Sequence, residues 1–406
     1  MRRALALARR GYGTTSPNPM VGAVLVKDGK IIGQGWHRRA GEPHAEIEAL
    51  RDAERRKNSP KGATLYVTLE PCCTHGRTPP CTDAIAAAGI RRVVIAATDP
   101  NPNHAGKGLA ILTKAGIEVL SLNGGAQSDA PYRALADEAA RLNEAFNHWI
   151  VHRTPFVTVK AAMTLDGKIA TASGESKWIT GEAARAEGMR LRAGADAILV
   201  GVNTVLADDP SLTVRQTPNT KIQAPRLRRV VLDSQARTPL KAKIVSDEFA
   251  GLTTIIVSRS APAKRVASLA KRVTVWAAPL RGGRIDLRWV LKKLGGENVT
   301  SLLIEGGGEV NASFLLGGFA QRVTFFYAPK ILGGRESRKA VAGEGARSLG
   351  EMLNLRDVEW RRVGVDLMMT ALVAGHSGVS PVSKPGRTKA RAAGNSASAP
   401  RRKRSR

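Results

Sequence analysis

Cysteine and aromatic residues are scarce in this chain of 406 residues, and it contains no long hydrophobic run. The three cysteines, Cys72, Cys73 and Cys81, share one stretch of ten residues, which is not the spacing of a disulfide-stapled secreted domain. No apolar run approaches the roughly 20 residues that span a bilayer. The apolar stretch within the first ten residues is too short for a secretory signal. We therefore expect a cytoplasmic protein without a membrane partner, whose cysteines act as ligands.

Acidic residues are also few, because 34 Asp and Glu stand against 63 Lys and Arg, a net charge of +29. Such an excess makes nucleic acid, an acidic membrane surface or a phosphorylated small molecule plausible partners. Residues 376–406 contain no acid at all and are rich in Ser, Pro, Gly, Ala, Lys and Arg. This composition predicts a disordered basic tail, since it cannot bury enough apolar surface to offset chain entropy.

Helices and strands are predicted to alternate along residues 1–150, which indicates an α/β domain. It opens with a β-hairpin over 21–36, since Asp28-Gly29 is a strong two-residue turn signal between apolar runs. The further predicted elements are helices at 45–56, 81–88 and 107–115, strands at 63–68, 91–97 and 117–120, and one helix over 130–151 leading out of the domain.

A second α/β domain is predicted for residues 151–375, with no repeat of the first. Its expected strands lie at 156–162, 195–200, 229–233, 252–257, 299–304, 322–327 and 366–373, and its expected helices at 182–193 and 286–294.

A three-ligand metal site is predicted in the first domain from His44, Cys72 and Cys81. One imidazole and two thiolates leave the fourth tetrahedral position open, as a catalytic zinc requires. Glu46, two residues after His44, is the candidate for proton transfer. Cys73 and His75 are competing ligands, but adjacent Cys72 and Cys73 side chains diverge, so we favour Cys72. His-x-Glu followed by Pro-Cys is the signature of zinc nucleobase deaminases.

Eight residues separate Cys72 from Cys81, where nucleic-acid deaminases have two. The segment Glu70–Cys81, together with Ser16–Gly22, Gly35–His37 and Asp99–Pro102, resembles the bifunctional deaminase-reductases of riboflavin biosynthesis. The resemblance implies a cytidine-deaminase-like three-layer domain. It also implies that Asn18 and His37 contact a pyrimidine and that Arg77 and Thr78 contact a ribose phosphate. The family often has a histidine where this chain has Thr74.

The second half resembles the reductase of the same family in the segments 160–170, 176–180 and 201–215, which implies a dihydrofolate-reductase-like α/β fold. Independently, the Gly-rich turn in 304–310 between a strand and a helix can offer backbone N–H groups to a pyrophosphate. It lacks the G-x-G-x-x-G pattern of a Rossmann domain. The resemblance assigns NADPH to Ala162, Trp178, Thr204, Ser234, Gly306, Gly307 and Gly308.

The resemblance further implies a substrate side of the reductase site. It comprises Ser176, Arg192, Asp208, Leu212, Arg215 and Glu305. Lys160 and Asp208 are the candidate catalytic residues, and Arg192 and Arg215 are expected to hold the substrate phosphate. Arg259, just after a predicted strand, is a candidate for the 2′-phosphate of NADPH.

The predicted function is therefore bifunctional. Zinc-dependent hydrolysis would convert 2,5-diamino-6-(5-phosphoribosylamino)pyrimidin-4-one to 5-amino-6-(5-phosphoribosylamino)uracil, and NADPH would then reduce the ribosyl side chain to ribityl. We expect a homo-oligomer acting on this small substrate, with no specific nucleic acid. Two alternatives remain: an RNA- or DNA-editing deaminase recruited through the basic tail, and an enzyme with only one active half.

Overall fold

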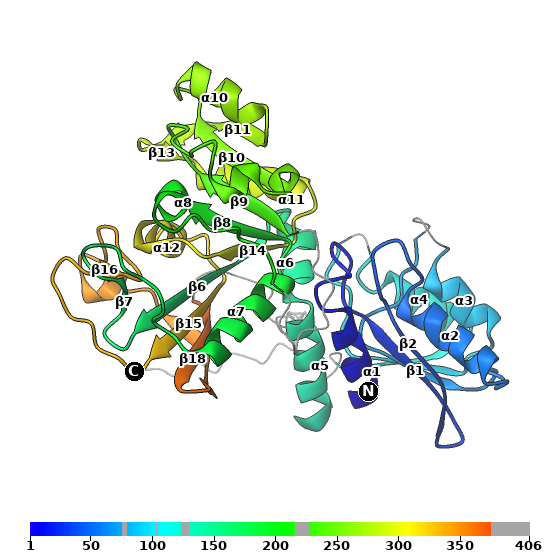
Figure 1. Ribbon diagram of the computed structural model, residues 1–406. Helices are drawn as coiled ribbons and strands as arrows, with labels where there is room; N and C mark the ends of the chain where they lie inside the picture. Colours follow the sequence, from blue (N-terminus) through cyan, green and yellow to red (C-terminus); the bar gives the residue numbers. More distant parts are fainter. Residues whose placement is uncertain (75–78, 103, 123–129, 216–226, 375–406) are drawn as a thin grey trace, which may run out of the picture.

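The computed structural model describes residues 1–74, 79–102, 104–122, 130–215 and 227–374. They contain two large β-sheets that share no strand. Figure 1 shows the part from the first sheet, in blue and cyan, beside the part from the second, in green to orange, with helices α5 and α6 between them. The predicted site residues Arg77 and Thr78, the competing ligand His75 and the basic tail lie outside the described residues.

The first sheet has five strands in the order β2-β1-β3-β4-β5. Strand β1 pairs antiparallel with β2 on one side and β3 on the other, whereas β3, β4 and β5 run parallel. At the predicted hairpin turn, Asp28 and Gly29 both have positive φ, as a two-residue turn of type I′ requires. The elements are α1 (Arg2–Ala8), β1 (Gly22–Lys27), β2 (Lys30–Trp36), α2 (Ala45–Arg55), β3 (Thr64–Val67), α3 (Cys81–Ala87), β4 (Arg92–Ile95), α4 (Lys107–Lys114) and β5 (Glu118–Ser121).

Small residues bring helix α2 close to the sheet. Ala45, Ala49 and Ala53 recur every four residues on one helical face and are completely buried. On strand β2, a Cβ added at Gly33 would lie 2.4 Å from the carbonyl oxygen of Ala49. The helix therefore packs directly on the strand backbone. This contact fixes the start of α2, where the predicted His44 and Glu46 lie. On the opposite face of the sheet, α1 and α5 bury a separate set of apolar residues, which completes three layers.

The prediction of one helix over 130–151 is wrong, because two helices, α5 (Ala130–Leu142) and α6 (Glu144–His152), meet at Asn143. The buried side chain of Asn143 accepts a hydrogen bond from the Met20 N–H at 2.7 Å and donates one to the Met20 carbonyl oxygen at 2.9 Å. Asparagine competes with helical hydrogen bonding in this way. The break therefore ties α5 and α6 to the segment that carries Asn18.

The second sheet has nine strands in the order β11-β10-β9-β8-β14-β6-β15-β18-β17. The first seven run parallel, and β18 and β17 complete one edge in antiparallel pairing. Its strands are β6 (Phe156–Thr164), β8 (Ala197–Gly201), β9 (Arg228–Leu232), β10 (Thr253–Ser258), β11 (Thr274–Ala278), β14 (Ser301–Ile304), β15 (Arg322–Ala328), β17 (Leu355–Val363) and β18 (Asp366–Val373).

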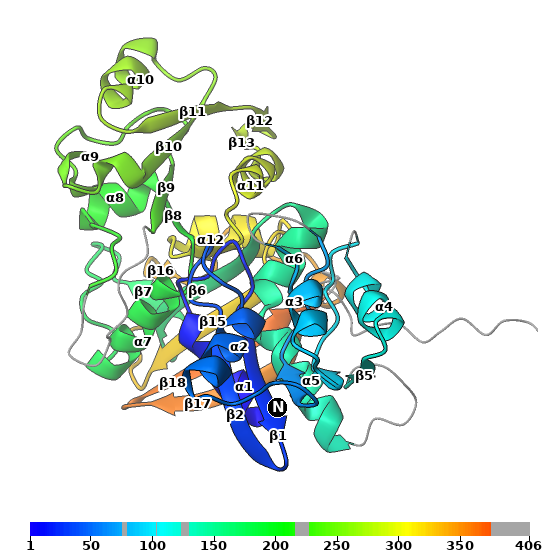
Figure 2. The ribbon, with the colours of Figure 1, turned by 90° about the vertical axis from the view of Figure 1, so that its right-hand side faces the viewer.

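Helices and two small two-stranded sheets surround this large sheet, as Figure 2 shows from the side. The helices are α7 (Glu182–Ala193), α8 (Val202–Asp208), α9 (Lys243–Ser246), α10 (Ala263–Ala270), α11 (Leu287–Gly296) and α12 (Gly308–Leu315). The two small sheets pair β12 (Leu280–Arg281) with β13 (Arg284–Ile285), and β7 (Lys168–Ala170) with β16 (Arg338–Lys339). Because β14, β8 and β9 are parallel neighbours, their carboxyl ends meet at one edge, where α/β proteins bind ligands.

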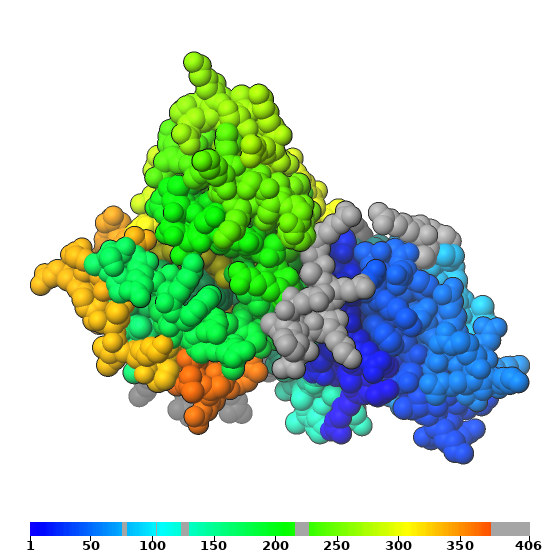
Figure 3. Space-filling model, viewed as in Figure 1, coloured from blue at the N-terminus to red at the C-terminus, as the bar shows by residue number. Residues whose placement is uncertain are grey.

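The two halves contact each other through side chains near α7 and α6. Tyr12 donates a hydrogen bond to the Arg190 carbonyl oxygen, and Trp149 Nε1 donates one to the Gly295 carbonyl oxygen at 2.9 Å. The Arg322 guanidinium forms a two-point ion pair with Glu144, with one N–O distance of 2.7 Å. Figure 3 shows the halves as two adjoining masses. Among the described residues, no helix has the length and apolarity to cross a bilayer.

Candidate functional sites

The predicted metal ligands lie together in the first domain. His44 precedes α2 and Cys81 begins α3, while Cys72 lies in the segment after β3. The His44 Nδ1 atom is 3.4 Å from Cys72 Sγ and 3.3 Å from Cys81 Sγ, and all three ligand atoms lie within 4.8 Å of one another. Cys73 is not part of this cluster and is half-buried.

These distances fit a zinc ion. A tetrahedral zinc with Zn–N near 2.05 Å and Zn–S near 2.3 Å separates nitrogen from sulfur by about 3.6 Å, close to the observed spacing. A hydrogen bond from the Cys81 thiol, followed by one from His44, lowers the pKa of Cys72 to about 4. Cys81 in turn has a raised pKa because it shares its proton with Cys72. The lowered pKa of Cys72 favours its thiolate, the form that binds metal.

Glu46, the second residue of α2, lies beside the metal-ligand cluster but is not one of the clustered ligands. Its side chain is 3% exposed, on the first turn of α2. Burial, followed by the charge of Cys72, raises the pKa of Glu46 to about 7. A carboxyl group with such a pKa can take up and release a proton near neutral pH. The structure therefore brings the predicted proton-transfer residue beside the predicted ligands.

Asn18 and His37 reach the same site from the segments on either side of the β1–β2 hairpin. The Asn18 Nδ2 atom lies 3.1 Å from His37 Nε2, and His37 Nδ1 lies 3.1 Å from the Pro43 carbonyl oxygen. The His37 and His44 rings meet edge to face with centroids 5.2 Å apart. Burial lowers the pKa of His37, which favours its neutral form. A neutral imidazole and an amide are suited to hydrogen bonds with a pyrimidine.

Glu70 is a structural part of this site for which the sequence suggested no role beyond its place in a motif. Its carboxylate accepts hydrogen bonds from the backbone N–H groups of Asp99, Gly106 and Gly108, at 3.0–3.2 Å. A Cβ at Gly108 would lie 2.5 Å from the Pro71 carbonyl oxygen. The start of α4 therefore packs against the residue before Cys72, and Glu70 holds it there. The sequence feature that could have indicated this structural role is the position of Glu70 directly before Pro71-Cys72.

A second cluster lies in the large sheet, where Lys160 on β6 and Arg192 on α7 both contact Glu305, directly after β14. Glu305 accepts two hydrogen bonds from Arg192 at 2.7 and 3.0 Å, and its Oε2 lies 3.5 Å from Lys160 Nζ. Burial by itself would raise the pKa of Glu305, but the charges of Arg192 and Lys160 outweigh it and lower this pKa to about 2. The carboxylate is therefore ionised, and it keeps both cations in the site.

Arg192 is thus already paired in the structure, and its Nη1 donates a further hydrogen bond to the Thr213 carbonyl oxygen at 3.1 Å. Ser176 Oγ donates a hydrogen bond to Asp208 Oδ1 at 3.4 Å, so two further residues of the predicted substrate side contact each other. Leu212 is 4% exposed and packs in the core, so the structure does not present it to a substrate. Arg215 is exposed at the end of a described segment. Its phosphate role stays a prediction.

Five of the seven predicted cofactor residues, Thr204, Ser234, Gly306, Gly307 and Gly308, gather at the carboxyl ends of β14, β8 and β9. Gly306 and Gly308 are sterically required, since Cβ atoms there would lie 2.6 Å from Val310 Cβ and 2.3 Å from the Lys339 carbonyl oxygen. A Cβ added at Gly307 would meet no described atom within 4 Å, so the backbone of this residue is accessible at the start of α12. Thr204 lies on the first turn of α8 and Ser234 follows β9.

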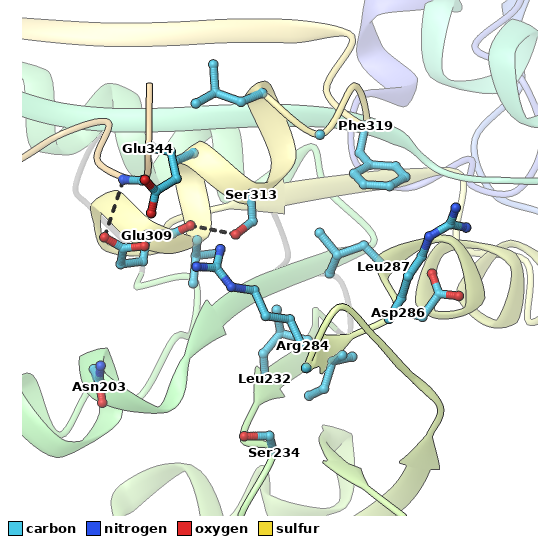
Figure 4. Close-up of a pocket in the computed structure, with 18 of the residues that line it drawn as sticks. Asn203, Leu232, Ser234, Arg284, Asp286, Leu287, Glu309, Ser313, Phe319 and Glu344 are labelled. Carbon is cyan, nitrogen blue, oxygen red and sulfur yellow. Dashed lines mark hydrogen bonds between the residues drawn. The ribbon is translucent and has the colours of Figure 1, made fainter. Parts of the chain in front are cut away.

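A cavity of about 720 Å³ adjoins these residues, shown in Figure 4. Ser234 lines it, as do Asn203 beside Thr204 and Glu309 beside Gly308. Two other predicted cofactor residues lie elsewhere: Ala162 is half-buried on β6, and Trp178 is 63% exposed with the Arg185 guanidinium 4.8 Å above its ring. Of the predicted cofactor residues, Ser234 therefore lines this cavity directly.

Comparison with protein families finds two matches. Residues 155–369 match the model of the RibD C-terminal domain, and residues 1–97 match the model of the cytidine and deoxycytidylate deaminase zinc-binding region. The first covers the large sheet and the second contains the His44, Cys72 and Cys81 cluster.

Two relatives align with nearly the whole of this chain, across both regions. The riboflavin biosynthesis protein RibD of Aquifex aeolicus is 45% identical over 369 residues, which cover 91% of this chain and 96% of the relative. That of Escherichia coli is 41% identical over 381 residues, covering 91% and 97%. The structure of Acinetobacter baumannii RibD matches with a TM-score of 0.78 and 36% identity over 92% of this chain and 97% of that one.

A Thermotoga maritima structure matches with a TM-score of 0.76 and 35% identity, over 92% of this chain and 97% of that one. It is described as a diaminohydroxyphosphoribosylaminopyrimidine deaminase/5-amino-6-(5-phosphoribosylamino)uracil reductase.

Proposed function

The chain belongs to the RibD family of riboflavin-biosynthesis deaminase-reductases, and from this membership we propose which of its residues carry each reaction and on which substrate. It is a bifunctional enzyme with a zinc-binding deaminase domain and an NADPH-using reductase domain. The predicted α/β fold of both parts is confirmed. For the domain limits we propose 1–150 and 151–375, with 376–406 as a tail.

The proposed deaminase substrate is 2,5-diamino-6-(5-phosphoribosylamino)pyrimidin-4-one. The observation that carries this proposal is the cluster of His44, Cys72 and Cys81 beside buried Glu46 and the Asn18–His37 pair. A zinc ion on the three ligands supplies Lewis acidity and lowers the pKa of water. Glu46 accepts a proton from the attacking water and delivers it to the leaving 2-amino group, so that ammonia departs and the carbonyl of the uracil forms.

The proposed reductase substrate is the product of that step, 5-amino-6-(5-phosphoribosylamino)uracil. NADPH supplies the hydride that the ribosyl C1 carbon receives. The Glu305 carboxylate lies 3.5 Å from Lys160 Nζ and holds this side chain in the site. Lys160 then donates a proton to the ring oxygen of the ribosylamine as the ring opens. Asp208 and Ser176, which are hydrogen-bonded to each other, orient the sugar hydroxyls.

The structure suggests a narrower role for Arg192 than phosphate binding. Its guanidinium is occupied by Glu305 and Thr213. We therefore assign it to positioning Glu305, and we leave the substrate phosphate to Arg215.

Purified protein tests the proposal directly. With zinc bound, ammonia release from the diaminopyrimidine and oxidation of NADPH with the deaminated compound are both expected. Silence in both assays refutes the substrate assignment. Activity in only one assay supports the alternative of a single active half, and deamination of a polynucleotide in place of the free compound supports the editing alternative.

A second copy of this chain is the proposed partner at strand β17, the last strand at one edge of the nine-stranded sheet. Along β17, Trp360 is 60% exposed and Val358 47%. An exposed edge strand presents unpaired backbone groups and is a template for pairing with another strand. Antiparallel pairing about a twofold axis at Trp360 would place Glu359 of each copy opposite Arg361 of the other. The charges are therefore self-complementary.

Light scattering of the purified protein checks this surface. A mass near twice 43.2 kDa is expected. Trp360→Glu should shift it toward the monomer, whereas Ile331→Glu, at another exposed apolar residue, should not. A monomeric wild type refutes the proposal. We also propose a cytoplasmic location, supported by the three free cysteines, two of which lie among the metal ligands.

A further inference from the structure

Two arginines of a short hairpin line the cavity beside the predicted cofactor residues. Strands β12 and β13 are joined by the two-residue turn Gly282-Gly283, in which both glycines have positive φ. The turn makes Arg281 and Arg284 direct cross-strand partners. Directly opposed residues of an antiparallel pair project from the same face, so both guanidinium groups leave the hairpin on one side. Both residues line the cavity.

This pairing is unfavourable without a ligand. Like charges directly opposite each other destabilise a hairpin. In the part of the chain that the structure describes, neither guanidinium has a hydrogen bond or an ion pair to an acid. Arginines 228, 229 and 322, by contrast, are each paired with a carboxylate. Two adjacent unneutralised guanidinium groups at a cavity form a site for a group with two negative charges, such as a phosphate monoester.

The cavity places this pair opposite the predicted cofactor residues. In Figure 4, Arg284 extends from the hairpin toward Glu309 on α12, and Ser234 lies below the hairpin. Ser234 follows β9, Asn203 is on the first turn of α8, and Glu309 is on the first turn of α12. The cavity therefore spans the carboxyl ends of three neighbouring strands and is closed on its far side by the hairpin.

We propose that Arg281 and Arg284 bind the 2′-phosphate of the adenosine ribose and so select NADPH over NADH. The inference rests on the proposed use of NADPH by this domain. The 2′-phosphate is the only chemical difference between the two cofactors, and arginine is the side chain that accommodates it in dinucleotide sites. Arg259, the residue that the sequence suggested, follows β10, which lies on the far side of β9 from β8. Arg259 does not line the cavity.

Binding measurements on the full-length protein separate this proposal from catalysis. The probes are adenosine 2′,5′-bisphosphate and AMP, which differ only in the 2′-phosphate, together with NADPH and NADH, each measured by calorimetry. For Arg281→Gln/Arg284→Gln we expect NADPH and the bisphosphate to bind at least about 10-fold more weakly, about 1.4 kcal/mol, with AMP and NADH changed less than about twofold. Replacing Arg284 by lysine in place of glutamine should retain part of the affinity for NADPH and the bisphosphate. Lysine keeps the positive charge but lacks the two parallel N–H donors of the guanidinium.

Two further variants make the result decisive. Arg91→Gln, which removes one positive charge at an exposed arginine of the other domain, should leave all four affinities unchanged. Arg259→Gln tests the rival residue. The proposal is overturned if wild type prefers NADPH and the double variant keeps that preference, or if Arg259→Gln removes it. A wild type that binds neither cofactor refutes instead the proposed function on which the inference rests.

Discussion

Glu305 offers the sharpest test of how the reductase site is held together. Its carboxylate contacts Arg192 twice and Lys160 once, with only 11% of its side chain exposed. We consider Glu305→Gln, which keeps the size of the side chain and removes its charge. Two cations would then lie side by side in a largely buried site without a counter-charge, which costs about 3–5 kcal/mol when one partner of a buried pair is removed.

The pKa of Glu305 gives a second, independent magnitude. A fall from 4.5 in the unfolded chain to about 2 in the folded one corresponds to about 3 kcal/mol, at about 1.4 kcal/mol per tenfold change in proton affinity. Because the folded pKa is lowered, this stabilisation is complete above about pH 4.5 and is lost as the pH falls through 2. At pH 3 about 1.4 kcal/mol should remain. The difference between wild type and Glu305→Gln should therefore shrink between pH 5 and pH 3.

The assay is urea unfolding of the full chain, followed by hydrogen exchange of peptides from β14 and α12, which report this domain separately. Glu297→Gln is the matched control, since Glu297 also contacts two cations, Arg228 and Lys293, but is 31% exposed. A half-exposed pair is screened by water, so this control should lose less than about 1 kcal/mol. If Glu305→Gln costs no more than the control, or if its cost does not change with pH, burial is not what makes this cluster strong.

Four other predictions concern the deaminase site, the contact between Asn143 and Met20, and the basic tail. Glu46→Gln should abolish ammonia release but keep bound zinc and leave reduction of the deaminated compound unchanged; loss of both activities would contradict separate sites. Cys72→Ser should lower the zinc content, measured by mass spectrometry, and deaminase activity together, without affecting NADPH binding. Asn143→Ala removes two hydrogen bonds to Met20 and should cost about 2–3 kcal/mol in stability and raise the deaminase KM through the segment of Asn18; a change in kcat alone would refute this link. Deletion of 377–406 should leave both activities as they are in the full chain, and a large loss in either assay would give the tail a role in catalysis.

Much of the fold could be predicted because its signals are local. The helix at 182–193 and the strand at 366–373 coincide with the observed elements, since an apolar pattern sets where each begins and ends. The edge strand β17 was missed, because eight of its nine residues are exposed and five are charged, so no alternation of buried and exposed residues marks it. The break at Asn143 was missed for a different reason. Its cause is a contact with Met20, which is distant in sequence.

The candidate sites divide in the same way. The types and order of His44, Glu46, Cys72 and Cys81 indicated zinc chemistry, because only a few side chains bind this metal or move protons beside it. The sequence could not show that Glu305 neutralises both Lys160 and Arg192, although all three were candidate residues. Arg192 and Glu305 are 113 positions apart, and nothing in either local pattern links them.

The sequence alone therefore determined the class of each reaction and the elements that carry it, since these depend on residue type and on local spacing. The tertiary structure decided which charges meet. It pairs Arg192 with Glu305, and it places Arg281 and Arg284 at a cavity that Arg259 does not line. Among the described residues, Arg281 and Arg284 form no ion pair. The physical reason is that electrostatic interactions depend on the distance between charges and on their burial, which the fold sets independently of sequence separation.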